Sequence, residues 1–290
     1  MDNELIAVTG ATGNIGSRVA TRLAELGVRQ RLLVRDPSRA PRANGAEVRI
    51  VSSYAATAEM RAALEGAHTV LLVPGREQED RLAEHRSAVD AIAAAGVRTV
   101  VYLSWINAAP DAIFTLARDH DATEGYLRGT GIPCTFLRMS LYMDSIPLMT
   151  GADGVIAGPA ADGRVAAVLR RDVADSAVAA LLSERHLRQT YDLTGPEAFT
   201  FTEAAEVMSR ISGKTIRFHN ETVDEAYASR GKYQAPDWEV AAWVTTYTAI
   251  AAGDLSHVSD SVRVLTGHEP VSLTEYLGSS PHSLDHVVAG

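Results

Sequence analysis

The sequence predicts an α/β protein: a Rossmann-type, doubly wound parallel sheet with a smaller C-terminal α/β subdomain. The first observation is a short apolar strand at residues 5–8, which runs into a glycine-rich turn and then a helical pattern. Secondly, apolar strands alternate with helical stretches through about the first 140 residues, as in a parallel sheet covered on both faces. Thirdly, roughly the last 95 residues are mixed and less periodic, which indicates a separate small subdomain.

The glycine turn carries the strongest functional signal. Gly10 permits a sharp turn off the strand, Gly13 leaves room for a phosphate beside the backbone, and Gly16 lets helix and strand pack closely. A diphosphate would then bind free N–H groups at the N-terminus of the helix. The spacing therefore predicts a dinucleotide site, with contacts from Thr9, Gly10, Thr12, Gly13, Asn14, Ile15 and Gly16.

Helical and strand patterns place the remaining elements in order. Apolar residues recur at three- and four-residue steps from Ile15 to Leu26, and Gly27 stands where a C-terminal cap belongs. Short apolar runs bounded by turn residues then predict further strands. Strands are expected at 31–34, 47–51, 69–73, 98–103 and 133–137, and helices around 57–65, 77–95 and 119–129.

A change of composition after residue 150 suggests a domain boundary. Residues 151–163 are rich in Gly, Ala and Asp and are expected to form a loop that leaves the main sheet. Residues 191–195 predict a returning strand. The chain thus divides into a dinucleotide-binding domain at 1–150, with a return segment at about 168–196, and a substrate-binding subdomain at 151–167 and 197–290.

Composition argues against several classes of function. A formal net charge of −9 without a basic cluster is unfavourable for nucleic-acid binding. No apolar run approaches the length of a membrane span, and the single cysteine, Cys134, suits a cytoplasmic protein. His282 and His286 have helical spacing but no third ligand, so we expect no metal site. The expected partners are a small-molecule substrate and, in a homodimer, a second copy of the chain.

The end of the second strand favours NADP(H) over NAD. Asp36 precedes Pro37, the pattern of a helix N-cap followed by proline, so its carboxylate has a structural task. Arg35 then ends the strand and is expected to face the adenosine, where a guanidinium can pair with a 2′-phosphate. Arg39, one turn later, can supply a second positive charge. The alternative, two solvated surface arginines, stays open at this point.

Five segments carry the pattern of a known family. They are Thr9-Gly-Ala-Thr-Gly-Asn-Ile-Gly16, Leu33-Val-Arg-Asp-Pro37, Ala95-Gly-Val-Arg-Thr-Val-Val-Tyr-Leu-Ser104, Gly131-Ile-Pro-Cys-Thr-Phe-Leu-Arg138 and Tyr191-Asp-Leu-Thr-Gly-Pro-Glu197. These segments resemble the NmrA-like branch of the atypical short-chain dehydrogenase/reductases. The resemblance is closest to the NADPH-dependent quinone oxidoreductases, which carry a His-x-x-x-Glu element, here His120 and Glu124. It implies a Rossmann-type sheet, a small C-terminal substrate subdomain and NADP(H) between them.

The chain departs from the family pattern at two places. Family members often place an aspartate after the third strand to contact the adenine, whereas this chain has Ser53 there. The pocket segment Met139-Ser-Leu-Tyr-Met-Asp144 also differs from the Asn-Gly-Trp type associated with quinone reduction. The first departure concerns the adenine contact, and the second concerns the substrate.

The usual catalytic pair of short-chain dehydrogenases, Tyr-x-x-x-Lys, is absent: none of the nine tyrosines has a lysine four residues later. Ser104 at the end of the fifth strand and Tyr142 after the sixth are candidates instead. His120 and Glu124 lie about one turn apart on one helix face. Histidine can donate a proton near neutral pH, and a neighbouring carboxylate can orient it or raise its pKa.

Each of these residues also has a structural interpretation. His120 suits a cofactor-positioning or structural histidine equally well, and Ser104 suits a strand-end hydroxyl satisfied by a neighbour. Tyr142 and Trp105 suit aromatic walls that stack on a planar substrate. The remaining predicted cofactor contacts are Ser53, Val73, Pro74, Ser104 and Trp105, and the predicted substrate contacts are Trp105, Arg138, Met139 and Tyr142.

The predicted function is NADPH-dependent reduction of a small planar substrate, either quinone-like or an aromatic carbonyl, enone or imine. Hydride transfer to an electron-poor acceptor gives a stabilised oxyanion that water can protonate, so the missing Tyr–Lys pair is compatible with such a substrate. Two alternatives stay open. One is a non-catalytic NADP(H)-sensing regulator of the NmrA type, and the other is an isomerase or cyclase on the same fold.

Overall fold

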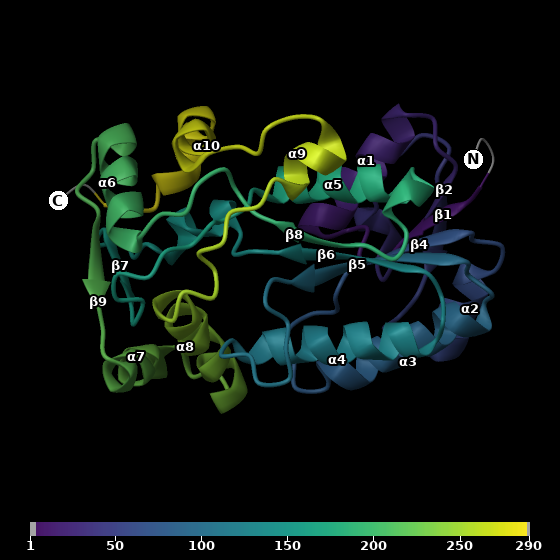
Figure 1. The fold of residues 1–290 in the computed structure, drawn as a ribbon, viewed down its shortest axis with the longest axis horizontal. Coiled ribbons are helices and arrows are strands. Elements are labelled where there is room, and N and C mark those ends of the chain that lie inside the picture. The colour runs from purple at the N-terminus through teal and green to yellow at the C-terminus, as the bar shows by residue number, and fades with distance from the viewer. Residues whose placement is uncertain (1–3, 289–290) are drawn as a thin grey trace. The chain divides into compact units, whose positions relative to one another are not determined.

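The computed structural model describes residues 4–288, and residues 1–3 and 289–290 lie outside the description. Its main element is a seven-stranded sheet with the order β3-β2-β1-β4-β5-β6-β8 (Figure 1). The pairs β1–β2, β1–β4, β2–β3 and β4–β5 are parallel. The strands are β1 (Ile6–Val8), β2 (Gln30–Val34), β3 (Glu47–Ile50), β4 (Thr69–Leu72), β5 (Thr99–Trp105), β6 (Cys134–Met139) and β8 (Thr190–Leu193).

The strand order reverses direction between β1 and β4. The chain adds β2 and β3 on one side of β1, then returns to place β4, β5 and β6 on the other. In doubly wound sheets, ligands bind at the carboxyl ends of the strands at such a switch point. The predicted Rossmann-type fold is confirmed, and the glycine turn lies at the switch point.

Helices cover both faces of the sheet. Figure 1 shows α1 (Asn14–Glu25) and α5 (Arg170–Leu181) on one face. The other face carries α2 (Thr57–Leu64), α3 (Arg81–Ala94) and α4 (Thr115–Gly129). Apolar side chains between the sheet and these last three helices form a buried core, including Leu72, Ile92, Tyr102, Leu127 and Phe136. Burial of apolar surface on both sides explains why the strands are almost continuously apolar.

The chain divides into two compact units. Unit 1 comprises Met1–Pro110, Asp119–Arg138 and Arg171–Asp192, and unit 2 comprises Asp111–Arg118, Met139–Arg170 and Leu193–Gly290. Unit 1 therefore ends its second segment at Arg138, whereas the sequence suggests a boundary at 150. In unit 2, β7 (Val155–Gly158) pairs in parallel with β9 (Arg217–Asn220). Its helices are α6 (Phe201–Ser212), α7 (Val223–Arg230), α8 (Asp237–Ala251), α9 (Ser261–Thr266) and α10 (Leu273–Ser279).

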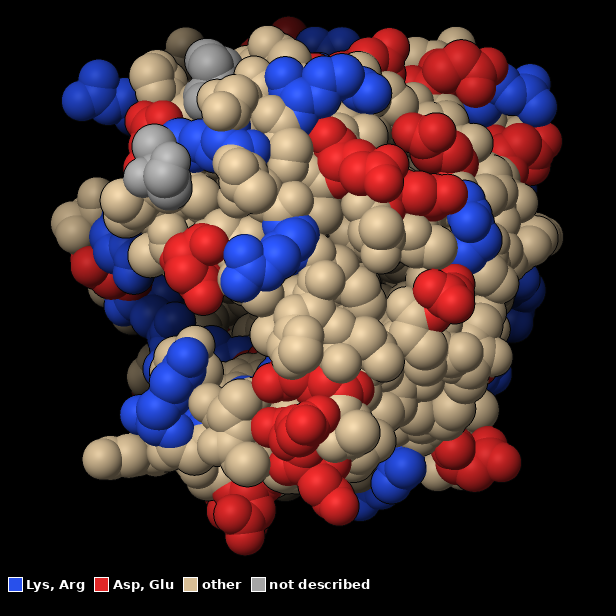
Figure 2. Space-filling model, turned by 90° about the vertical axis from the view of Figure 1, so that its left-hand side faces the viewer, with Lys and Arg blue, Asp and Glu red and all other residues tan. Residues whose placement is uncertain are grey.

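Short 3-10 helices complete the chain: η1 (Pro37–Arg39), η2 (Met143–Ser145), η3 (Pro147–Met149), η4 (Glu184–His186), η5 (Gly231–Tyr233) and η6 (Pro281–Leu284). Between residues 4 and 288, no helix combines the length and the apolar character needed to cross a bilayer. On the face drawn in Figure 2, acidic and basic side chains are interspersed, and neither sign covers the face continuously.

The first helix docks tightly onto the first strand. Ile15, Val19 and Leu23 bury one face of α1, and Gly27 takes the left-handed conformation expected of its cap, with φ of +70°. A Cβ atom on Gly16 would overlap the carbonyl oxygen of Gly10, so the helix can approach the turn only with glycine at this position. This contact fixes where α1 begins.

Gly16→Ala should therefore destabilise the protein by about 2 kcal/mol or more, because backbone atoms must move to admit the new methyl group. Gly125→Ala is the matched control, since Gly125 is also helical and a Cβ there would meet no atom within 4 Å. The control should lie within about 1 kcal/mol of the wild type, on the stabilising side. Urea unfolding measures both free energies. Equal stability of the two variants would contradict the close contact.

Candidate functional site

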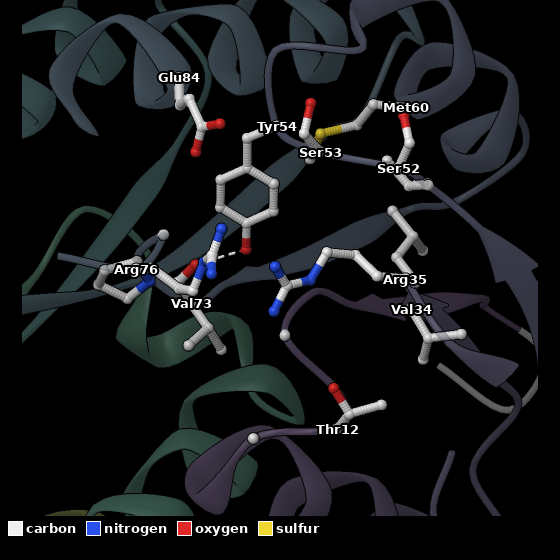
Figure 3. A pocket seen from close by; sticks show the side chains of 16 residues that line it. Thr12, Val34, Arg35, Ser52, Ser53, Tyr54, Met60, Val73, Arg76 and Glu84 are labelled. Carbon is white, nitrogen blue, oxygen red and sulfur yellow. Dashed lines mark hydrogen bonds between the residues drawn. The ribbon is translucent and has the colours of Figure 1, made fainter. Parts of the chain in front are cut away.

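A cavity of about 290 Å³ lies in unit 1 at the carboxyl ends of the strands around the switch point (Figure 3). Its walls come from the glycine turn, the end of β2, the loop after β3, the loop after β4 and one side chain each of α2 and α3. The sequence-predicted residues that line it are Gly10, Thr12, Gly13, Arg35, Ser53, Val73 and Pro74. The cavity thus brings together residues from several elements that the sequence assigned to one dinucleotide site.

The other predicted cofactor residues lie outside this lining. Thr9 is fully buried at the end of β1, and Ser104 and Trp105 are the last two residues of β5. The remaining four are Asn14, Ile15 and Gly16 in the first turn of α1, and Arg39 at the end of η1.

The glycine turn leads directly into the N-terminus of α1. Gly10 has a φ of +57°, and a Cβ on it would lie 3.1 Å from the Cβ of Val73. Gly13 donates its N–H to the carbonyl oxygen of Gly10 (2.9 Å) and is the N-cap of α1, with no side-chain cap. The first N–H groups of the helix are therefore free of a capping side chain, which is the arrangement that binds phosphate groups.

The hydroxyl of Thr9 joins three segments beneath the cavity. It donates to the carbonyl oxygen of Leu71 (3.0 Å) and accepts from the N–H of Val73 (2.9 Å). The phenol of Tyr54 lies 2.8 Å from this hydroxyl and 2.6 Å from the carbonyl oxygen of Val73. Burial raises the pKa of the Tyr54 phenol, so Tyr54 stays a neutral donor. Thr9 thus connects the end of β1, the end of β4 and the loop after β3 beneath the cavity.

Two guanidinium groups face the cavity. Figure 3 shows Arg35 from the end of β2 and Arg76 from the loop after β4, on either side of the Tyr54 hydroxyl. Within residues 4–288, neither forms a hydrogen bond or an ion pair with another side chain. Two unpaired positive charges that face one cavity are the chemistry of an anion site.

Asp36 has the structural task that its sequence context predicts. Its Oδ1 accepts hydrogen bonds from the N–H (2.9 Å) and the hydroxyl (2.6 Å) of Ser38, and it caps the short helix that begins at Pro37. The hydrogen bonds from Ser38 lower the pKa of Asp36 below its usual range. The Asp36 carboxylate is therefore hydrogen-bonded to Ser38, at the position where NAD-binding proteins use an acidic side chain to bind the ribose.

Glu124 is the centre of a buried ion-pair cluster. Its carboxylate is fully buried and accepts two hydrogen bonds from Arg138, at 2.8 and 2.7 Å. The hydroxyl of Ser104 donates to it at 2.6 Å, and Arg128 donates at 2.8 Å. The cluster joins α4 to the ends of β5 and β6. Ser104 and Arg138 are therefore held by Glu124.

The expectation that Glu124 orients His120 or raises its pKa is wrong. Glu124 is directed to Ser104 and the two arginines, whereas His120 contacts the phenol of Tyr102 through Nδ1 (2.9 Å) and Arg81 through Nε2 (3.0 Å). A guanidinium can only donate, so Nε2 accepts and Nδ1 carries the proton. Burial, and then the charge of Arg81, lower the pKa of His120 well below its usual value. His120 is thus neutral near pH 7.

A second buried histidine supports the wall of the cavity. The N–H of Gly75 donates to Nε2 of His85 (2.9 Å), and Nδ1 of His85 lies 2.9 Å from the hydroxyl of Thr123. That hydroxyl donates to the carbonyl oxygen of Asp119 (2.7 Å). Burial, followed by the charge of Arg81, lowers the pKa of His85 to about 3. A neutral imidazole therefore links the loop after β4 to α4.

The predicted substrate residues are divided between the two units. Trp105 and Arg138 belong to unit 1, and Met139 and Tyr142 belong to unit 2. The Tyr142 hydroxyl donates to the thioether sulfur of Met139 (2.6 Å), and the guanidinium of Arg170 lies 4.1 Å from the centre of its ring. A thioether is a weaker hydrogen-bond acceptor than the carboxylate that accepts from Ser104.

Fold and site together define a dinucleotide-binding protein of the Rossmann type. The chain belongs to the NmrA-like family, whose model matches residues 2–248. The resemblance inferred from the sequence is therefore confirmed.

Two relatives are similar over almost the whole chain. Quinone oxidoreductase 2 of Escherichia coli (strain K12) is 30% identical over 278 residues, which cover 93% of this chain and 96% of that protein. The (4-alkanoyl-5-oxo-2,5-dihydrofuran-3-yl)methyl phosphate reductase of Streptomyces griseus subsp. griseus is 37% identical over 273 residues, which cover 91% and 93%. Both relatives are oxidoreductases by name, and the chain is an oxidoreductase of this family.

Two solved structures are also similar to this chain. The NADPH complex of the Escherichia coli quinone oxidoreductase matches with a TM-score of 0.87 and 30% identity, covering 95% of this chain and 99% of that one. The NADP(H) complex of triphenylmethane reductase from Citrobacter sp. matches with a TM-score of 0.84 and 30% identity, covering 95% and 99%.

The neutral state of His120 predicts how stability depends on pH. Its folded pKa lies below its unfolded value of about 6.5, so below pH 6.5 the unfolded chain binds an extra proton and stability falls on acidification. Each such histidine contributes about 1.4 kcal/mol per pH unit in this range. His120→Asn should be less stable than the wild type overall but should lose stability less steeply between about pH 6 and 4.

Urea unfolding at several pH values measures these slopes. His257→Asn is the control, because His257 is exposed and, within residues 4–288, its side chain forms no hydrogen bond or ion pair. The control should keep the wild-type slope. A His120→Asn slope equal to that of the wild type would show that His120 is protonated in the folded protein.

Proposed function

We propose that the chain is an NADPH-dependent reductase of a small planar, electron-poor substrate, such as a quinone or an aromatic carbonyl, enone or imine. The observation that carries the cofactor assignment is the pair of unpaired guanidinium groups, Arg35 and Arg76, facing the cavity beside the glycine turn. The proposal is supported by two relatives whose solved structures contain NADPH and NADP(H).

The residues of the cavity fit this cofactor. The glycine turn and the N-terminus of α1 would hold the diphosphate, because no side chain caps the first N–H groups of the helix and glycine at positions 10 and 13 leaves the backbone open to a phosphate. Arg35 would bind the 2′-phosphate, with Arg76 as the second guanidinium of the cavity, whereas Arg39 is outside the lining. Ser53, Val73 and Pro74 would line the adenosine. When bound, NADPH supplies the hydride for the reduction.

The buried polar residues of unit 1 are better suited to positioning than to proton donation. Ser104 donates to Glu124, Glu124 is saturated by two arginines, and His120 is a neutral imidazole with both nitrogens engaged. Tyr142 is the remaining candidate of the predicted set, because its phenol carries a proton at neutral pH and donates to the thioether of Met139, a weak acceptor. We propose Tyr142 as the proton donor for acceptors that need one, and water for quinones.

Aromatic side chains would supply the walls for a planar substrate. Trp105 ends β5 and Tyr142 lies in unit 2, and flat rings of this kind stack on aromatic ligands. Met139 could adapt its flexible side chain to ligand shape. Arg138 is tied to Glu124, so we assign it to holding this region in place.

Anaerobic mixing of the protein with NADPH and a panel of quinones, enones and imines tests the reductase. We expect steady loss of absorbance at 340 nm with at least one quinone. A second candidate function is an NADP(H) sensor. It is favoured because the side chains of His120, Ser104 and Glu124 are already hydrogen-bonded to other protein groups. Tight NADPH binding without oxidation by any acceptor would contradict the reductase and support the sensor.

Arg35→Ala should weaken NADPH binding about 10- to 100-fold, because a charged hydrogen bond to the 2′-phosphate is lost. Binding of NADH, which lacks that phosphate, should change less than about threefold. Arg39→Ala is the matched control and should leave both affinities near the wild-type values. Isothermal calorimetry measures the dissociation constants of NADPH and NADH for the wild type and both variants. Equal losses for NADPH and NADH in Arg35→Ala would assign Arg35 to another part of the cofactor.

Tyr142→Phe should separate the two classes of acceptor. We expect quinone reduction within about threefold of the wild type, because its anionic product needs no protein acid. Reduction of an enone or imine should fall about 10²- to 10⁴-fold in kcat. Tyr227→Phe, at an exposed tyrosine of α7, is the control. Equal effects of Tyr142→Phe on both classes would make Tyr142 a binding wall only.

A further inference from the structure

The loop after β3 offers no carboxylate to the cavity. Its residues in the cavity lining are Val51, Ser52, Ser53 and Tyr54. The neighbouring acid, Glu59, accepts both the N–H (2.8 Å) and the hydroxyl (2.7 Å) of Ser52. Those hydrogen bonds lower the pKa of Glu59 and hold it at the start of α2. An acidic contact to a ligand must therefore come from another element.

Helix α3 brings a carboxylate to the same cavity. Glu84 is half-buried and lines the cavity, and Figure 3 shows its carboxylate beside the ring of Tyr54. Its Oε2 would lie 3.5 Å from a Cβ on Gly75, so the carboxylate is next to the loop after β4. In the described part of the chain, Glu84 forms no hydrogen bond through its side chain and no ion pair.

The charges of the cavity are arranged asymmetrically. The unpaired guanidinium groups of Arg35 and Arg76 suit the phosphate of the ligand, whereas the carboxylate of Glu84 repels phosphate and can only accept hydrogen bonds. In the 2′-phosphorylated adenosine of NADPH, the donors available to a carboxylate are the 6-amino group of the base and the 3′-hydroxyl of the ribose. The 3′-hydroxyl is on the carbon next to the one that carries the 2′-phosphate, whereas the 6-amino group is on the distal edge of the base, which favours the amino group as the partner of Glu84.

We propose that Glu84 recognises the 6-amino group of the adenine, in place of an acidic residue after β3. The inference rests on the proposed placement of adenosine in this cavity. It assigns adenine selectivity to a side chain of α3. Ser53 then contributes a neutral hydroxyl to the same wall.

A cofactor analogue tests this assignment directly. In reduced nicotinamide hypoxanthine dinucleotide phosphate, a carbonyl oxygen replaces the 6-amino group and the neighbouring N1 gains a hydrogen, while the ribose, phosphate and nicotinamide parts are unchanged. The wild type should bind NADPH at least about tenfold more tightly than this analogue, because the carbonyl oxygen would face a carboxylate. Glu84→Gln should reduce the ratio to about twofold or less, because an amide can donate to the carbonyl oxygen as well as accept from an amine.

The ratio of the two affinities within one variant is the decisive quantity, because a general loss of cofactor affinity cancels in it. Isothermal calorimetry gives both dissociation constants without turnover, so a failure of the reductase proposal would leave this test valid. Glu79→Gln is the control: Glu79 is exposed, lies just before α3 and is outside the cavity lining. It should keep the wild-type ratio.

Two results would overturn the proposal. An unchanged ratio in Glu84→Gln, with both affinities at their wild-type values, would show that Glu84 does not contact the adenosine. An unchanged ratio with an equal loss of affinity for both cofactors would assign Glu84 to the 3′-hydroxyl of the ribose. Glu84→Asp provides a second variant if Glu84→Gln folds poorly, and its shorter side chain should give an intermediate ratio. A ratio at or above the wild-type value in Glu84→Asp would count against the assignment.

Discussion

One buried hydroxyl, that of Thr9, determines the shape of the cofactor cavity. The Thr9 hydroxyl bonds to the carbonyl oxygen of Leu71 and to the N–H of Val73, and the phenol of Tyr54 bonds to the Thr9 hydroxyl. The ends of β1 and β4 and the loop after β3 are thereby held at fixed positions. The glycine turn and the loop that contains Gly75 form walls of the cavity above these hydrogen bonds. Every proposed contact to the adenosine depends on that arrangement.

The buried charges of unit 1 explain why its polar residues are better suited to support than to chemistry. A fully buried carboxylate such as Glu124 must be paired, and Arg138, Arg128 and Ser104 satisfy it. A buried imidazole beside Arg81 must stay neutral, since a second positive charge there would be unpaired and repelled. A reductase built in this way depends on cofactor binding and on an activated substrate, with little help from protein acids.

Local signals in the sequence were sufficient for the fold and for part of the site. The spacing of the glycines predicts the turn, and Asp36 before Pro37 predicts a cap, because both depend on neighbouring residues. The partners of Thr9, and the contacts of Glu124 with Ser104 and Arg138, could not be predicted, since those residues lie far away in the sequence. The contribution of His85 to the cavity wall depends on Gly75 in the preceding loop, and no sequence spacing marks such a pair. For the other predicted site residues, the direction of the side chain decided whether it lined the cavity, and the sequence alone does not give that direction.

The central claim is that this cavity binds the adenosine end of NADPH. A crystal structure of the protein with NADP+ tests it most directly. We predict the adenosine in the cavity, the 2′-phosphate within hydrogen-bonding distance of both Arg35 and Arg76, and the bonds among Thr9, Tyr54 and Val73 unchanged. An adenosine outside the cavity, or a 2′-phosphate in solvent away from both arginines, would contradict the account.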